Sequence, residues 1–191
     1  MQYKKQGTRD KILACALEEF YKYGESNASI RRIAEKAEVA VGNIYNYFDS
    51  KRAIFDAIIN PVAQGINGIF DQIMEFGLSI KKVDELAETA VPYMVKNRRE
   101  LRLLMNTASD KGGLIKEDFF NQFSYKIKSE IDSLREKMDK QPISKEYSRA
   151  LSKSFLYGVF EILFSSEDSR AVTAMLKDYF VFFFGGLESR T

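Results

Sequence analysis

The sequence predicts an all-α protein of about nine helices, with a small N-terminal three-helix domain and a larger helical bundle after it. Apolar residues recur at helical spacing along most of the chain, and only three prolines and eleven glycines interrupt them in 191 residues. Hydrophobic residues make up 45% and charged residues 29%, the balance of an ordinary globular protein. We therefore expect two domains, residues 1–50 and 51–191.

The first sixty residues divide at clear start and stop signals. Residues 1–9 are polar and basic and are expected to form an arm, after which an apolar stripe predicts a helix that ends near Gly24. Ser29 is the candidate N-cap of a second short helix over 30–37. Three residues interrupt it before a third helix over 41–48. Lys51 begins a fourth helix, in which Pro61 should introduce a kink or a break.

The remaining helices are expected over 83–97, 98–108, 114–138, 145–165 and 169–187, with a loop at 109–113. The last two are apolar around more than one stripe, so they should pack on a second surface besides their own core, and a second copy of the chain is the simplest partner. The residues predicted for this dimer interface are Phe155, Val159, Phe160, Leu163, Met175, Tyr179, Phe180 and Phe183.

Composition excludes several classes of function. The chain has no histidine and a single cysteine, Cys15, so a disulfide framework within the chain and a zinc site are not expected. No nucleophile, phosphate loop or spaced carboxylate pair stands out, and we expect neither catalysis nor a cofactor or metal. Cys15 reads as a small buried hydrophobe or as a redox switch. No signal peptide or long apolar run is seen, which favours a cytoplasmic protein without membrane contact.

The segment from Ser29 to Lys51 has the layout of a helix-turn-helix, in which the second helix enters the DNA major groove. Residues 1–52 carry ten basic and seven acidic side chains, a net charge of +3, whereas the rest of the chain carries −1. A basic N-terminal module fits a nucleic-acid partner. Gly42 would let the backbone approach the DNA, while Val41 and Asn43 have the chemistry to contact bases.

Other polar residues of this segment suit the phosphate backbone. Tyr45, Asn46 and Tyr47 have neutral hydrogen-bonding tips, and Lys51 places a charge at the start of the next helix. Both tyrosines could instead be half-buried packing residues, and Arg31 and Arg32 could simply solvate the second helix. The predicted DNA-binding set is Ser29, Arg31, Ala40, Val41, Gly42, Asn43, Tyr45, Asn46, Tyr47 and Lys51.

Residues 8–60 resemble the DNA-binding domain of the TetR family. The matching positions are Ile12, Leu13, Ala16, Phe20, Gly24, Ser29, Ile33, Ala34, Ala37, Val39, Gly42, Tyr45, Tyr47, Phe48 and Lys51. Two positions depart from the family pattern: Glu38 replaces the turn glycine, and Ala40 replaces the serine that caps the reading helix. Beyond residue 60 only the helical layout is similar, with the last two helices forming a dimer interface.

The resemblance implies a homodimeric repressor that binds a palindromic operator in double-stranded DNA and is released by a small-molecule effector. The aromatic-rich body predicts a hydrophobic or planar effector, with Tyr93, Phe119, Phe123, Tyr157 and Glu161 as candidate pocket residues. Glu161, in a nearly unbroken apolar run, could meet a cationic ligand, pair across the dimer or reach solvent. An enzyme and a helical scaffold that does not bind DNA are the competing functions, and a gel shift distinguishes them.

Overall fold

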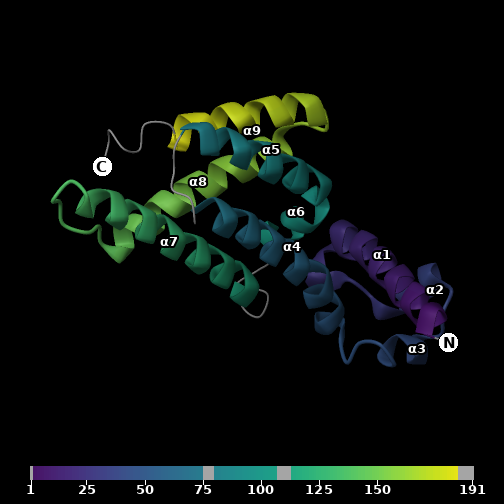
Figure 1. Ribbon diagram of the computed structural model, residues 1–191. Coiled ribbons are helices and arrows are strands. Elements are labelled where there is room, and N and C mark those ends of the chain that lie inside the picture. Colours follow the sequence, from purple (N-terminus) through teal and green to yellow (C-terminus); the bar gives the residue numbers. More distant parts are fainter. Residues whose placement is uncertain (1, 75–79, 107–112, 185–191) are drawn as a thin grey trace. The chain divides into compact units, whose positions relative to one another are not determined.

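The structure, a computed structural model, describes residues 2–74, 80–106 and 113–184, which form nine α-helices and no strand. Helix α1 spans Gln2–Asn27, α2 Ile30–Ala37, α3 Val41–Tyr45, α4 Lys51–Met74, α5 Ile80–Lys96, α6 Arg98–Asn106, α7 Gly113–Glu136, α8 Lys145–Ser165 and α9 Ser169–Phe184 (Figure 1). The all-α prediction and the order of the helices are confirmed. Within the described ranges, no helix has the length and apolar character needed to cross a membrane.

Three local predictions are corrected by these bounds. The expected N-terminal arm is helical from Gln2, since neither proline nor a second glycine interrupts it and Gln6 donates a hydrogen bond to Asp10 one turn later. Pro61 does not split α4, because buried side chains such as Ile59 and Val62 anchor the helix on both sides of it. The third helix is shorter than expected and ends at Tyr45. Residues 109–112 of the predicted central loop lie outside the described residues, and its last residue, Gly113, begins α7.

The chain forms two compact units. The first unit contains the described residues up to Val62 together with α6 from Arg99. The second contains the described residues of Ala63–Arg98 and those from Leu114 onward. Helix α4 therefore contributes residues to both units.

The first unit is held together by apolar residues of α1, α2, α3 and the first half of α4. Phe20 of α1 meets Phe55 of α4 edge to face, with ring centroids 5.3 Å apart, and both are buried. Helix α6 packs on α1 through Arg102, whose guanidinium donates a 2.9 Å hydrogen bond to the hydroxyl of Tyr21. Gly24 takes a positive φ of 72°, which favours glycine, and produces a kink inside α1 shortly before its end at Asn27.

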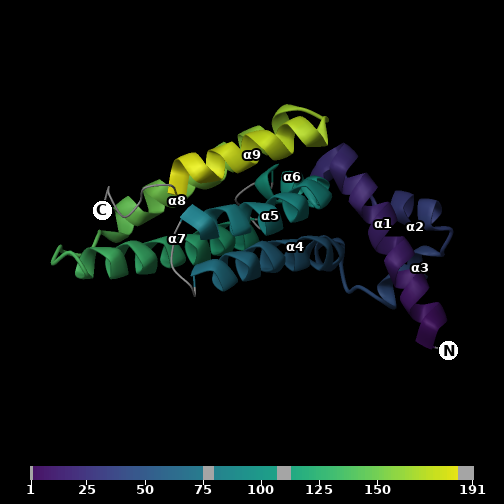
Figure 2. The same ribbon diagram turned by 45° about the horizontal axis from the view of Figure 1, so that its top comes forward.

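The second unit has an aromatic core centred on α8 and α9, which lie alongside each other and beside α5 (Figure 2). Phe155 of α8 is fully buried and contacts Phe123 of α7 as well as Phe180 and Phe184 of α9. Tyr179 of α9 crosses α8 at Gly158, and its hydroxyl donates to the carbonyls of Ser154 and Phe155. The absence of a Cβ at Gly158 permits this close crossing.

Candidate nucleic-acid interface

Helices α2 and α3 form a helix-turn-helix with a small core of its own. Its buried side chains are Ile33, Ala34, Ala37, Ile44 and Phe48, and Val39 is half-buried. The strong apolar stripe of α2 explains its docking, because four of its eight residues are small or branched hydrophobes on one side. Figure 1 shows α2 and α3 lying next to α1 at the N-terminal end of the chain.

The turn between α2 and α3 is made without glycine. Glu38 adopts the left-handed conformation with φ 56°, and its backbone N–H donates to carbonyls of the last turn of α2. A non-glycine residue pays about 1 kcal/mol for this conformation. Its carboxylate pairs with Lys11 of α1, and this contact lowers the pKa of the Glu38 carboxyl. Ala40 then precedes α3 in an extended conformation with no side-chain cap.

The outward face of α3 is accessible and mixed in chemistry. Val41 is 38% exposed and Tyr45 52% exposed, Asn46 is exposed, and Asn43 is half-buried. Gly42 is exposed as well, and a Cβ built on it meets no atom within 4 Å. It lies in the ordinary helical region, so neither backbone conformation nor packing within the chain requires glycine there.

Lys51 has a structural role that the sequence did not indicate. Its Nζ donates to the carbonyls of Ser26 and Ala28, at 2.9 and 3.0 Å, and so ties the start of α4 to the segment before α2. An ammonium group has three donors. One N–H therefore remains for an anion, which keeps the predicted phosphate contact chemically possible.

A buried carboxylate, Glu19 of α1, connects the first two helices. Its Oε1 accepts hydrogen bonds from the backbone N–H of Ser29, at 3.1 Å, and from Nε of Arg32, at 2.5 Å. Burial by itself raises the pKa of Glu19, but the Arg32 and Ser29 hydrogen bonds outweigh it and leave the pKa below its ordinary value. Ser29 thus begins α2 with its N–H satisfied and its hydroxyl free of any capping bond.

Because of the ion pair with Glu19, the two neighbouring arginines of α2 have different surroundings. Arg32 is engaged by Glu19, by the Asn27 carbonyl and by the ring of Tyr23, whereas Arg31 is exposed. Sequence reasoning missed Glu19, although Arg32 and Lys36 one turn apart on the next helix are a charge pattern that calls for a carboxylate partner. Cys15 on α1 is half-buried, and burial raises the pKa of its thiol, as expected of an inert cysteine.

The candidate ligand residues of the second unit differ in their exposure. Phe119 and Phe123 are buried in the aromatic core, and Tyr93 lies against α4 with its ring over Gly65. Tyr157 is half exposed on α8, and Glu161 is exposed, which agrees with the solvent alternative for that carboxylate.

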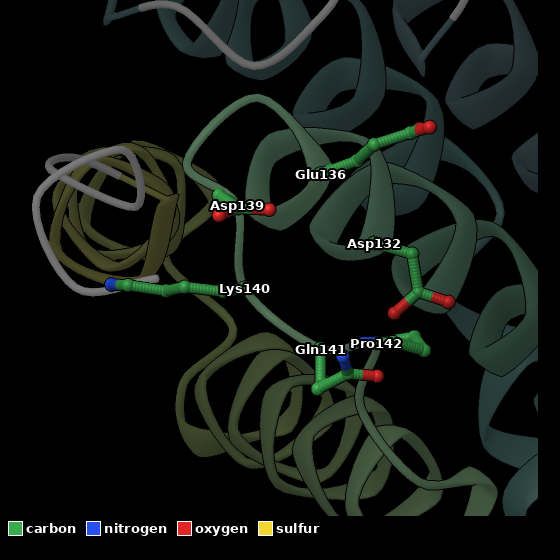
Figure 3. Close-up of a pocket in the computed structure, with 6 residues that line it drawn as sticks. All are labelled: Asp132, Glu136, Asp139, Lys140, Gln141 and Pro142. Carbon is green, nitrogen blue, oxygen red and sulfur yellow. The ribbon is translucent and has the colours of Figure 1, made fainter.

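A pocket of about 360 Å³ lies elsewhere in this unit, at the turn after α7. Asp132, Glu136, Asp139, Lys140, Gln141 and Pro142 line it (Figure 3). Asp132 is committed to the fold here: it pairs with Lys128 and accepts the backbone N–H of Ile143. Burial raises the pKa of Asp132, and these two hydrogen bonds more than offset the effect and lower it. The lining is polar, unlike the apolar pocket expected from the sequence.

Most of the predicted dimer-interface residues lie in the core of the single chain. Phe155, Val159, Phe160, Leu163 and Phe180 are between 0% and 3% exposed, so a partner could reach them only if the chain opened. Tyr179 and Phe183 are half-buried against α8, and Met175 is exposed. The large apolar side chains that are exposed on α8 and α9 are Tyr147, Tyr157, Met175, Val181 and Phe182, the last 71% exposed, and of these only Met175 belongs to the predicted set.

The arrangement defines a helical protein with an N-terminal helix-turn-helix, and comparison with known proteins agrees. Residues 12–58 match the family described as "Bacterial regulatory proteins, tetR family". This match confirms the resemblance to that family seen in the sequence, and it covers the helix-turn-helix and the helices on either side of it.

Two curated relatives are transcriptional regulators by name. The chain is 29% identical over 85 residues to the "HTH-type transcriptional repressor KstR2" of Rhodococcus jostii, covering 44% of this chain and 42% of the relative. It is 39% identical over 59 residues to the "HTH-type transcriptional regulator UidR" of Escherichia coli, covering 31% and 30%. The matches span less than half the length of these relatives.

Solved structures share the fold over nearly the whole chain. A TetR-family transcriptional regulator, PfmR from Thermus thermophilus, superposes with a TM-score of 0.72 at 14% identity, covering 93% of this chain and 95% of that one. The transcriptional regulator FadR from Bacillus subtilis, solved in complex with stearoyl-CoA, gives a TM-score of 0.68 at 14% identity, covering 92% and 97%. The helical fold of the described residues is thus shared with these two regulators.

Proposed function

We propose that the protein is a dimeric transcriptional repressor whose α3 reads DNA and whose second unit binds a hydrophobic or planar effector that releases it. Gly42 carries the DNA-binding part of the proposal. Glycine weakens a helix by about 0.5–1 kcal/mol relative to alanine. The residue is exposed, has helical backbone angles and has open space beside it, so no contact among the described residues compensates for this cost. Close approach of a DNA backbone to Gly42 would compensate for it.

The rest of the exposed surface of α3 suits the same partner. Val41 offers a methyl contact for thymine, Asn43 offers an amide for adenine, and the Tyr45 hydroxyl is free to meet a phosphate oxygen. Arg31 adds an exposed positive charge on α2. The names of the two curated relatives, one of them a repressor, support the direction of regulation.

The dimer part of the proposal rests on the outward face of α8 and α9. Tyr157, Met175, Val181 and Phe182 are large apolar side chains that remain 40–71% exposed on these two helices, and exposed apolar surface of this kind marks interaction sites when it is contiguous. A second copy related by a two-fold axis would cover this face and would pair two reading helices for a palindromic site. The interface therefore uses the exposed residues of these helices, and the buried phenylalanines support it from below.

The effector part of the proposal rests on the aromatic core of the second unit and on the stearoyl-CoA complex of the structural neighbour. Apolar side chains such as Phe119 and Phe123 would receive a greasy or flat group. An effector that binds the folded state raises the melting temperature and, if it acts on DNA binding, must lower DNA affinity by the linked amount.

The test is selection of duplexes from a random DNA pool, followed by gel shifts of the enriched duplex at low and moderate salt. A regulator enriches a two-fold symmetric sequence and binds it far more tightly than scrambled DNA. Stearoyl-CoA is then added as a first effector probe, with melting temperature and DNA affinity measured together. A chain that enriches no sequence is not a DNA-binding regulator and is better described as a helical interaction protein.

A further inference from the structure

Two asparagines lie on one side of the reading helix, three residues apart. Asn43 belongs to α3 and Asn46 is its C-cap residue, so their side chains are neighbours on the helix surface. The Nδ2 of Asn46 donates a 3.2 Å hydrogen bond to the Oδ1 of Asn43. In the described part of the chain, neither amide makes a second side-chain hydrogen bond. The two amides therefore form an isolated pair at the exposed edge of the unit.

The hydrogen bond determines which groups the pair presents outward. It occupies one lone pair of the Asn43 oxygen and fixes the direction in which that amide faces. Asn43 keeps both Nδ2 donors and the second lone pair of its oxygen. Adenine shows an acceptor, N7, beside a donor, the N6 amino group, in the major groove. A single amide matches both when its oxygen and nitrogen are held in the right order.

We propose that Asn46 is a positioning residue that presets the amide of Asn43 for adenine, so that the two asparagines act as one reading unit. The inference rests on the proposed DNA-binding function. It assigns Asn46 this role in place of the phosphate contact expected from the sequence, because the Nδ2 hydrogen bond directs the Asn46 amide toward Asn43. Without Asn46, the side chain of Asn43 samples other rotamers. Ordering that side chain on the DNA then costs conformational entropy, so Asn43 discriminates less strongly between bases.

Four variants of the full chain test the proposal: Asn43→Ala, Asn46→Leu, the double variant, and Asn60→Leu as control. Leucine matches asparagine in shape but cannot donate to Asn43, and Asn60 is an exposed asparagine of α4 in the same unit. All four changes are at accessible or half-accessible positions, so circular dichroism should report an unchanged fold. Binding is measured on the duplex selected by the wild type and on duplexes with each base pair changed in turn, at two salt concentrations.

We expect Asn43→Ala to lose discrimination at one base pair of each half-site, by about 5- to 150-fold. Asn46→Leu should lose several-fold at the same base pair with an unchanged salt dependence, and the double variant should be no worse than Asn43→Ala. The control should bind like the wild type.

Three results would overturn the proposal. Uniform weakening of all duplexes by Asn46→Leu, with a shallower salt dependence, would make Asn46 a phosphate contact. Additive losses in the double variant, or binding of Asn46→Leu like the wild type, would mean that the two amides act independently. If the wild type itself selects no duplex, the DNA-binding function fails, and the positioning role fails with it.

Discussion

Replacing Gly42 by alanine should move the stability of the protein and its affinity for DNA in opposite directions. The added Cβ meets nothing within 4 Å, and the backbone is already helical, so the change removes the entropic cost of glycine without a clash. The free energy of unfolding should rise by about 0.5–1 kcal/mol. Since α3 has five residues and frays easily, the lower end of this range is the better estimate.

On DNA the same methyl group would stand between the helix and the sugar-phosphate backbone. We expect Gly42→Ala to weaken binding at least tenfold and Gly42→Val to abolish it, while circular dichroism and the melting temperature show an intact fold. Gly68→Ala is the matched control, because it too places a Cβ in open space on a helix, but in the second unit. Unimpaired DNA binding by Gly42→Ala would refute the argument that this glycine serves a close approach.

Three further predictions concern the ion pair of the first unit, the packing of the second unit and the proposed dimer interface. Glu19→Gln should lower the free energy of unfolding by about 1–3 kcal/mol, since it removes the charge that holds Arg32. The folded-state pKa of Glu19 is lowered, so its contribution is present above the ordinary glutamate pKa and disappears as pH falls through the folded-state value; the variant should therefore show a weaker loss of stability on acidification below about pH 4.5. If the control variant Glu18→Gln reduces the loss of stability at acidic pH as much as Glu19→Gln does, the result would contradict the assignment to Glu19. Gly158→Ala puts a Cβ 2.2 Å from the Tyr179 hydroxyl and should cost about 1–3 kcal/mol in a denaturant titration; a neutral effect would show that Tyr179 is free to leave α8. Phe182→Asp should shift sedimentation from dimer to monomer with the fold retained, and a dimer unchanged by it would place the interface elsewhere.

The order and type of the helices could be predicted because each has a long apolar stripe or a clear capping signal. Boundaries were less predictable where two local signals compete. At Pro61 the lost hydrogen bond argues for a break, yet buried residues before and after it keep α4 continuous. The polar composition of residues 1–9 indicated an arm, but polar residues form helix readily when neither proline nor a run of glycine interrupts them.

The accessible residues of the reading helix could be predicted from the sequence, because the spacing of Ile44 and Phe48 determines which side faces inward. The polar contacts around this helix could not be predicted from the sequence. Glu19 lies on the buried stripe of α1, and only the folded arrangement brings it to Ser29 and Arg32, ten and thirteen residues away. Lys51 likewise meets two carbonyls that are distant in sequence.

The interface residues illustrate a more general limit. An apolar stripe shows that a side chain is removed from water, but it does not show whether its own chain or a second chain covers it. Phe155 and Phe180 satisfy the pattern of an interface and are covered by the core of the second unit. Phe182 lies on the same helix as Phe180 and is exposed, and only the three-dimensional structure separates the two.

The most direct test of the central claim is the affinity of the full-length protein and its Gly42→Val variant for the duplex that the wild type enriches from a random pool. The protein should bind that two-fold symmetric duplex at least a thousandfold more tightly than scrambled DNA. The Gly42→Val variant should fold normally and should bind neither the selected duplex nor scrambled DNA. Equal affinity of the two proteins, or no preference of the wild type for any duplex, would contradict the assignment of α3 as a DNA-reading helix.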